Sequence, residues 1–211
     1  MFIPLVDILR CPNAHDETWL VASIDRAEER DILEGTLGCP ACLAEYPIRN
    51  GVVHFAEVAP APTMNPREDH AVRLAAALDL TEARMTAVLH GAWGALAPIV
   101  RGLAPAQLLL VNPPAEIASG DGVSIVRAES APFARASVDA VALDANATDT
   151  MLASLVASVR AGGRMLGPIA HQVPSGFTEL TRDDEVWVAQ LETAPASAPV
   201  SLGRGPKRNT H

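Results

Sequence analysis

The sequence predicts a doubly wound α/β sheet preceded by a small β-rich module. Residues 85–114 read as strand, glycine turn, helix and strand, which is the size of one βαβ unit. Strand-like and helix-like segments continue to alternate after this unit, and two short apolar runs close the series. The first 55 residues instead carry short alternating segments around a C-x-x-C pair. The two parts of the chain therefore have different expected architectures.

Composition and charge restrict the classes of function. The chain has 211 residues, 49% of them hydrophobic, and a formal net charge of −9. This charge argues against broad nucleic-acid binding, which requires a basic surface. No apolar run approaches the roughly 20 residues that span a bilayer, so no membrane association is expected. An odd number of cysteines, three, behind an N-terminus without signal features suits the cytoplasm and a metal or free thiols.

The N-terminal module is expected to cover residues 1–55. Leu5, Ile8 and Leu9 read as a short helical turn, and residues 19–24, 32–37 and 46–55 read as strands, with a turn at Asn50-Gly51. Residues 56–66 form a linker, because their prolines disfavour a helix and their small side chains bury little surface. Residues 67–193 then form the α/β domain, and residues 194–211, rich in Pro, Ala and Gly, form a disordered tail.

Two segments of the N-terminal module carry a resemblance. L-V-D-I-L-R-C-P, from Leu5, and C-P-A-C-L-A-E-Y-P-I-R-N-G-V-V-H-F, from Cys39, resemble the small zinc-ribbon family that activates methyltransferases and is also found fused ahead of them. The resemblance implies a structural zinc ion held by Cys11, Cys39 and Cys42, and a protein partner such as a methyltransferase.

The first knuckle departs from that family's C-P-x-C pattern, because Ala14 stands where the second cysteine belongs. His15 follows one residue later and could complete a Cys₃His site, since zinc readily accepts imidazole. The alternative is a ribbon that has lost its metal and is stabilised by packing alone.

The α/β domain is expected to begin with an amphipathic helix at 68–78. The βαβ unit follows, with strands at 87–89 and 108–111 around a helix at 95–103. The further expected strands are 123–126, 140–143, 164–169, 177–181 and 186–191. A helix at 150–159 is expected to stop at Arg160-Ala161-Gly162-Gly163, a basic residue followed by glycines.

Three segments between Met85 and Leu191 resemble the class I S-adenosylmethionine-dependent methyltransferases. They read V-L-H-G-A-W-G, A-E-S-A-P-F-A-R-A-S-V-D-A-V and V-R-A-G-G-R-M-L-G, in that order. The resemblance implies a Rossmann-like methyltransferase sheet and an S-adenosylmethionine site. The positions that it assigns to this site are Gly91, Gly94, Asn112, Ala128 and Glu129.

The expected cofactor site departs from the family pattern at three places: the glycine loop, the ribose position and the adenine side. His90 and Ala92 stand where glycine is preferred, and Asn112 replaces the carboxylate that accepts hydrogen bonds from the ribose hydroxyls. At the adenine side the expected acid falls on Arg127, which would need Glu129 as an ionic partner. The alternatives are purely structural roles: turns at the glycines and at Asn112-Pro113-Pro114, and a surface Arg–Glu pair.

The joint departures favour a non-catalytic methyltransferase-like protein, a pseudoenzyme that acts as a binding or scaffold module and partners an active enzyme. The alternative is an active S-adenosylmethionine-dependent methyltransferase with an atypical cofactor site. No catalytic residue is identified, because positioning does most of the work in such reactions. An open cleft between Gly91, Asn112 and Ala128 would favour the enzyme, and a cleft filled by His90 and Trp93 would favour the scaffold.

Overall fold

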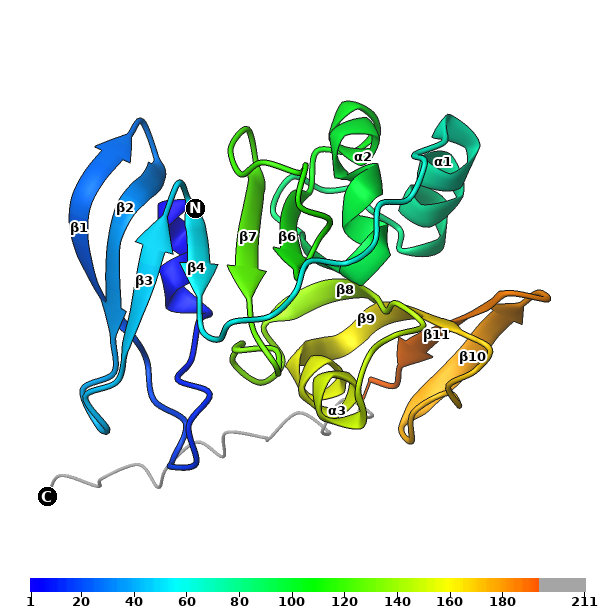
Figure 1. The fold of residues 1–211 in the computed structure, drawn as a ribbon. Helices are drawn as coiled ribbons and strands as arrows, with labels where there is room; N and C mark the ends of the chain where they lie inside the picture. Colours follow the sequence, from blue (N-terminus) through cyan, green and yellow to red (C-terminus); the bar gives the residue numbers. More distant parts are fainter. Residues whose placement is uncertain (194–211) are drawn as a thin grey trace, which may run out of the picture.

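One continuous sheet runs through the protein (Figure 1). The computed structural model of the chain describes residues 1–193, and the expected tail at 194–211 lies outside the described residues. The sheet has eleven strands in the order β1-β2-β3-β4-β7-β6-β5-β8-β9-β11-β10. The elements are η1 (Ile3–Asp7), β1 (Val21–Glu28), β2 (Asp31–Gly38), β3 (Glu45–Arg49), β4 (Val52–His54), α1 (Glu68–Ala77), β5 (Thr86–His90), η2 (Gly91–Leu96), α2 (Ala97–Leu103), β6 (Gln107–Val111), β7 (Val123–Arg127), β8 (Val138–Ala142), α3 (Asp149–Ser158), β9 (Val159–Pro168), β10 (Phe177–Arg182) and β11 (Val186–Leu191).

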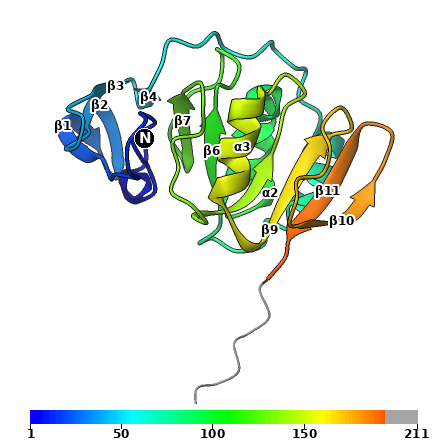
Figure 2. The ribbon, with the colours of Figure 1, turned by 90° about the horizontal axis from the view of Figure 1, so that it is seen from below.

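The expected doubly wound fold is confirmed. Strands β7, β6, β5, β8 and β9 are parallel, and the order reverses direction between β5 and β8. Such a switch point opens a crevice at the carboxyl ends of the strands, where ligands bind in this fold. Helices α1 and α2 pack on one face with one buried cluster, and α3 packs on the other face with a second (Figure 2). The closing strand β11 runs antiparallel to β9 and lies between β9 and β10.

The N-terminal strands β1 to β4 form an antiparallel meander. The expected strand at 46–55 is a hairpin, in which Asn50 (φ 50°) and Gly51 (φ 75°) form the turn between β3 and β4. Both turn residues have positive φ, the geometry that Asn-Gly favours in a two-residue hairpin.

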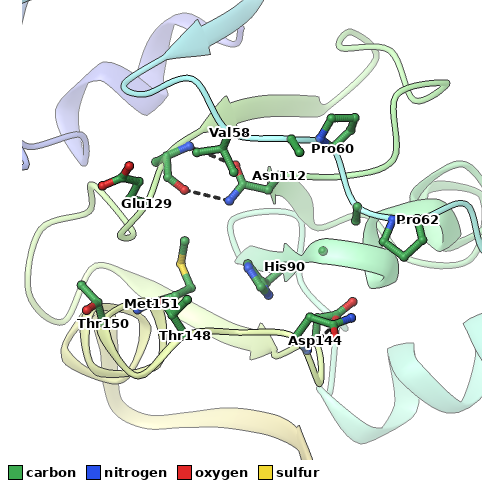
Figure 3. A pocket seen from close by; sticks show the side chains of 15 residues that line it. Val58, Pro60, Pro62, His90, Asn112, Glu129, Asp144, Thr148, Thr150 and Met151 are labelled. Atoms are coloured by element: carbon green, nitrogen blue, oxygen red, sulfur yellow. Dashed lines mark hydrogen bonds between the residues drawn. The ribbon is translucent and has the colours of Figure 1, made fainter.

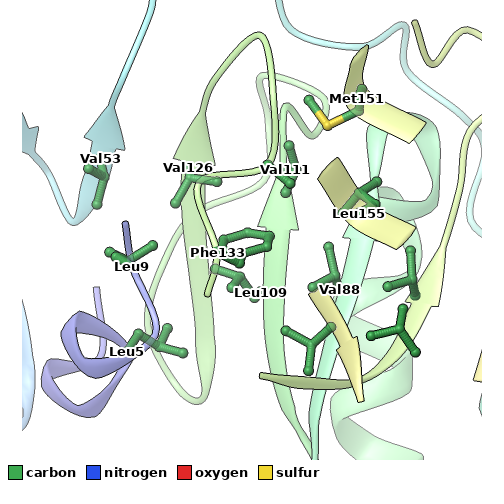
Figure 4. Close-up of a cluster of buried hydrophobic side chains, with 14 of the residues drawn as sticks. Leu5, Leu9, Val53, Val88, Leu109, Val111, Val126, Phe133, Met151 and Leu155 are labelled. Carbon is green, nitrogen blue, oxygen red and sulfur yellow. The ribbon is translucent and has the colours of Figure 1, made fainter. Parts of the chain in front are cut away.

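The meander and the parallel sheet are joined edge to edge. Strand β4 pairs in parallel with β7, with Val53 opposite Val126. On one face, Leu5, Leu9 and Val53 share a buried cluster with Val126 and Phe133 (Figure 4). The proposed division near residue 55 therefore separates two chain segments that share one sheet and one core.

Two crossover connections lack the helix that usually joins parallel strands. In the part of the chain that the structure describes, neither 112–122, between β6 and β7, nor 128–137, between β7 and β8, contains a helix. Prolines at 113, 114 and 132 disfavour one. Next to Phe133, the sheet is covered instead by Leu5 and Leu9 from the N-terminal segment (Figure 4).

The expected helix stop after α3 was wrong. Helix α3 ends at Ser158, and β9 begins at once with Val159 opposite Val138. The glycines form a bulge in β9, because the next pair joins Ala140 to Arg164. A Cβ at Gly163 would lie 2.7 Å from the Asp139 carbonyl oxygen, so the residue permits a close backbone approach and does not cap the helix.

The helices of the described residues are too short, or insufficiently apolar, to cross a lipid bilayer.

Candidate functional site

Four potential metal ligands meet beside the N-terminal meander. One ligand atom from each of Cys11, His15, Cys39 and Cys42 lies within 4.8 Å of the others. The Sγ atoms of Cys11 and Cys42 are 3.6 Å apart, and Cys39 Sγ is 3.5 Å from His15 Nε2. A tetrahedral zinc ion with Zn–S near 2.3 Å and Zn–N near 2.0 Å separates two sulfurs by about 3.8 Å and a sulfur from a nitrogen by about 3.5 Å. The four residues therefore form a Cys₃His set of a size that fits zinc.

The surroundings of the cluster stabilise a thiolate at Cys42. The Ala44 backbone N–H, together with Asn13 Nδ2 at 3.3 Å, lowers the pKa of Cys42 to about 6. Cys11 is buried, and this burial raises the pKa of its thiol even though Tyr46 Oη lies 3.1 Å from its sulfur. The Asp16 carbonyl contacts His15 Nδ1 at 2.7 Å, which directs Nε2 towards the sulfurs and raises the pKa of the imidazole. Amides that donate to a ligating sulfur and a carbonyl that orients a ligating imidazole are typical of zinc sites.

A cavity of about 600 Å³ lies at the carboxyl ends of β5, β6 and β8, at the switch point of the sheet (Figure 3). Four of the five residues predicted for the cofactor line it: Gly91, Asn112, Ala128 and Glu129. Gly94 does not, because it packs against Pro113, whose side chain a Cβ at this position would approach to 2.6 Å. The cleft is open, since Trp93 turns away and donates its indole N–H to the Leu143 carbonyl.

Both polar atoms of the Asn112 side chain form hydrogen bonds within the protein. Its Nδ2 donates to the Ala128 carbonyl at 2.7 Å, and its Oδ1 accepts the Ala128 N–H at 2.9 Å (Figure 3). The residue adopts φ 52°, a left-handed conformation that Asn tolerates better than most residues. This pair of hydrogen bonds joins the ends of β6 and β7. A ligand hydroxyl could bond only to the second N–H or the second lone pair of the amide.

The first turn after β5 is held by a buried carboxylate. Asp144 Oδ2 accepts the Ala92 N–H at 2.6 Å, and Oδ1 accepts the Asn146 N–H at 2.8 Å. Gly91 has φ 63°, and a Cβ there would lie 2.6 Å from the Asp144 carboxylate, so this position requires glycine.

His90 lies between this turn and the cavity. Its ring is 7% exposed, and Nδ1 has no hydrogen-bond partner among residues 1–193. Burial lowers the pKa of His90, and the Asp144 carboxylate opposes this shift only in part. The cavity thus presents a neutral imidazole near neutral pH.

The lowered pKa of His90 predicts a loss of stability in acid. An unfolded histidine has a pKa near 6.5. Below that pH the histidine is protonated in the unfolded chain but stays neutral in the native state. The contribution of His90 to the free energy of unfolding is therefore fully present above about pH 6.5 and is lost as the pH falls below this value. We expect the free energy of unfolding to fall more steeply between about pH 7 and pH 5 in the wild type than in His90→Gln, by at most about 1.4 kcal/mol per pH unit. Urea titrations at several pH values measure both slopes, and equal slopes would contradict the prediction.

Arg127 does not enter the cavity. Its guanidinium donates to the Pro113 carbonyl at 2.6 Å, and burial lowers its pKa. No ion pair joins it to Glu129 in the described part of the chain. The expected Arg–Glu pair is therefore not formed, and Glu129 remains an exposed acid at the cavity rim.

The sequence alone did not indicate several cavity residues. The expected linker supplies one wall through Val58, Ala59, Pro60, Ala61 and Pro62, and the Ala61 N–H lies 3.3 Å from the Asn112 carbonyl. Thr148, Thr150 and Met151 supply another wall at the start of α3. Thr148 caps this helix by accepting the Met151 N–H at 3.2 Å. Its place directly after β8 and before an apolar helix was the available signal.

A second cavity of about 440 Å³ lies on the α1 side of the sheet. Leu74, Trp93, Leu166 and Val188 form its apolar floor, and an ion pair between Arg73 and Asp183 at 2.8 Å crosses from α1 to the β10–β11 turn. Trp93 lines this second cavity and not the first.

Comparison with known proteins supports the N-terminal resemblance. Residues 4–51 match the family of Trm112p-like proteins. No curated protein matches the sequence. The chain thus begins with a Trm112p-like ribbon that carries a Cys₃His cluster.

Several solved methyltransferase structures are similar to the chain. A putative S-adenosylmethionine-dependent methyltransferase from Methanococcus maripaludis is 12% identical, with a TM-score of 0.48 over 61% of this chain and 85% of that one. The Burkholderia thailandensis 1,6-didemethyltoxoflavin-N1-methyltransferase, with its substrate and S-adenosylhomocysteine bound, is 17% identical, with a TM-score of 0.41 over 59% and 77%. A putative methyltransferase from Escherichia coli is 14% identical, with a TM-score of 0.42 over 64% and 92%. The strand order, and not these similarities, establishes the doubly wound fold.

Proposed function

We propose that this chain is a non-catalytic methyltransferase-like module, in which a zinc-bearing ribbon supports an α/β sheet of the same polypeptide. The observation that supports this function best is the pairing of Asn112 with the Ala128 backbone. A ribose-binding position needs acceptors that are free for two hydroxyls, and a carboxylate supplies them. Here an amide replaces the carboxylate, and each of its polar atoms already makes one hydrogen bond to the Ala128 backbone, which leaves a single lone pair as acceptor.

Cys11, His15, Cys39 and Cys42 would hold the zinc ion. Four protein ligands complete a tetrahedral shell, so the ion would supply structure and no open coordination position. Three free cysteines also suit a reducing compartment, and we place the protein in the cytoplasm.

The cavity would hold a neutral or cationic nucleoside-class ligand. Its lining includes the carboxylates of Glu129 and Asp144 and the neutral His90, but no lysine or arginine among the described residues. This charge pattern disfavours phosphate groups and tolerates a sulfonium such as that of S-adenosylmethionine. Gly91, Ala128 and Glu129 would contact such a ligand, while Asn112 would contribute little and Gly94 nothing.

The second candidate is an active S-adenosylmethionine-dependent methyltransferase with an atypical site. The open cavity favours it, because neither His90 nor Trp93 fills the space between Gly91, Asn112 and Ala128. When bound, the cofactor would supply an activated methyl group, and the protein would position it.

The arrangement of β4 bears on the expected methyltransferase partner. Strand β4 is paired on one edge with β3 and on the other with β7. This strand therefore offers no free edge to another protein. We propose that the ribbon primarily supports its own α/β domain, and that any separate methyltransferase would bind elsewhere on the chain.

Calorimetric titration with S-adenosylmethionine separates the two candidates. We expect no binding to the wild type at micromolar concentrations. Micromolar binding to the wild type would exclude the proposed function and favour the enzyme.

The pairing of Asn112 with Ala128 is tested by stability. Asn112→Asp is expected to lower the free energy of unfolding by about 1–3 kcal/mol, because aspartate cannot donate to the buried Ala128 carbonyl. Glu129→Gln is the control, since a change at this exposed side chain should alter the free energy of unfolding by no more than about 0.5 kcal/mol.

A further inference from the structure

The metal cluster and the cavity meet at one irregular segment. We define residues 127–134 as the wall segment: it begins with Arg127, the last residue of β7, and its Ala128 and Glu129 line the cavity. After Arg127 the segment contains no helix and only an isolated bridge at Phe133, so its position depends on the neighbours that hold it.

The first connection to the cluster runs through the backbone next to Cys11. The Arg10 N–H donates to the Pro132 carbonyl at 2.8 Å, and the Ala134 N–H donates to the Ile8 carbonyl at 2.8 Å. Between these bonds the fully buried Leu9 packs with Phe133 (Figure 4). The metal ligand Cys11 is thus one residue away from the first of these hydrogen bonds and three residues away from the second.

The second connection runs through aromatic side chains. Tyr46 Oη lies 3.1 Å from Cys11 Sγ, and the Tyr46 and Phe55 rings have centroids 4.7 Å apart. The Phe55 and Ala56 N–H groups then donate to the Arg127 carbonyl at 2.8 and 3.2 Å. This connection reaches the wall segment one residue before Ala128.

Only a few other bonds hold the wall segment. They are the pair between Asn112 and Ala128, a bond from Arg127 to the Pro113 carbonyl, a bond from the Ala131 N–H to Ser154 Oγ of α3 at 2.8 Å, and a bond from Ser137 Oγ to the Ala134 carbonyl at 2.7 Å. Ribbon contacts therefore contribute to holding both ends of the wall segment, whereas contacts within the α/β part alone hold its middle.

We infer that metal occupancy of the Cys₃His cluster controls how firmly the wall segment is held, and thereby the affinity of the cavity for its ligand. Metal binding stabilises the folded ribbon, because the ligand set does not exist in the unfolded chain. The coupling is reciprocal, so a cavity ligand also tightens metal binding. The inference rests on the proposed metal site and does not depend on which ligand fills the cavity.

Hydrogen exchange on the full chain tests the inference without any cavity ligand. We compare zinc-loaded protein with protein treated with a chelator and follow the amides of Arg10, Phe55, Ala128 and Ala134. Zinc removal is expected to speed their exchange at least about tenfold. Amides of β11, which is far from the ribbon in the strand order, such as that of Trp187 opposite Gly167, should change less than about twofold.

A matched pair of variants checks the route. Phe55→Leu removes the ring contact and keeps the backbone N–H, whereas Leu180→Ala alters an exposed side chain on β10. Phe55→Leu should reduce the effect of zinc on Ala128 exchange by more than half, and Leu180→Ala should leave it unchanged. If zinc binds stoichiometrically but protects only residues 11–18 and 39–46, the inference is wrong and the proposed metal site is still supported. Failure to bind zinc would overturn both, and neither result depends on the outcome with S-adenosylmethionine.

Discussion

Replacement of Cys42 by serine is expected to weaken zinc binding more than about 100-fold, since changes in second-shell partners alone cost about 10- to 100-fold. Cys42 is the exposed member of the cluster, so its removal disturbs little packing. Its sulfur lies 3.6 Å from Cys11 Sγ, and hydrogen bonds from the Ala44 N–H and Asn13 lower its pKa to about 6. Any loss of stability in Cys42→Ser should therefore result from weaker zinc binding and not from lost packing. Competition titration with a chromophoric chelator measures the affinity.

His15→Cys is the matched variant. It restores the cysteine-rich pattern of the related ribbons one residue beyond Ala14, and a Cys₄ set also binds zinc tetrahedrally. This variant should retain stoichiometric zinc, and its melting temperature should fall on chelation as that of the wild type does. A wild-type protein that binds no zinc under conditions that load His15→Cys would show that the cluster is held by packing alone.

Replacement of Phe133 by alanine is expected to lower the free energy of unfolding by about 3–5 kcal/mol, the usual cost of removing a buried aromatic ring. Phe133 is 7% exposed and packs with Leu9 of the ribbon and with Val126 of β7 (Figure 4). The cavity left behind would separate the ribbon from the sheet. Unfolding should then lose cooperativity, with the ribbon melting before the α/β part.

Phe177→Ala is the control for this result. Phe177 is 9% exposed in β10, at the opposite end of the sheet from the ribbon. Its loss should destabilise by a similar amount and preserve a single transition in urea, followed by circular dichroism. A single transition of unchanged m-value for Phe133→Ala, with a loss below about 1 kcal/mol, would mean that the two parts do not depend on this contact.

Local patterns predicted most elements well. Apolar runs such as 108–111 and 186–191 are strands because each lies between two neighbouring strands and buries most or half of its side chains. The Cys39–Cys42 spacing predicted two metal ligands, because a knuckle of four residues determines its own geometry. The prediction that the glycines at 162–163 stop the helix was wrong. Glycine occurs both in helix stops and in bulges, and here the glycines form a bulge in β9.

Contacts between distant residues could not be predicted from the sequence. Asn112 has the residue type of an ordinary turn, and only the folded chain brings Ala128 into reach of its amide. The prolines and small residues at 58–62 suggested an exposed linker, yet they line a cavity. Strand β4 is parallel to β7, so the chain leaves β4 at the carboxyl edge of the sheet, where the cavity lies.

The sequence by itself determined the order of strands and helices, the ribbon with its three cysteines, and the departures at His90, Asn112 and Arg127. These features depend on neighbours a few residues away, where periodicity and turn chemistry act. The tertiary structure decided that His15 reaches Cys39, that β4 extends the sheet at β7, and that Asn112 closes on Ala128. Each of these joins residues that are at least 16 positions apart, and such pairs form only when burial of the shared core offsets the entropy of closing the loop between them.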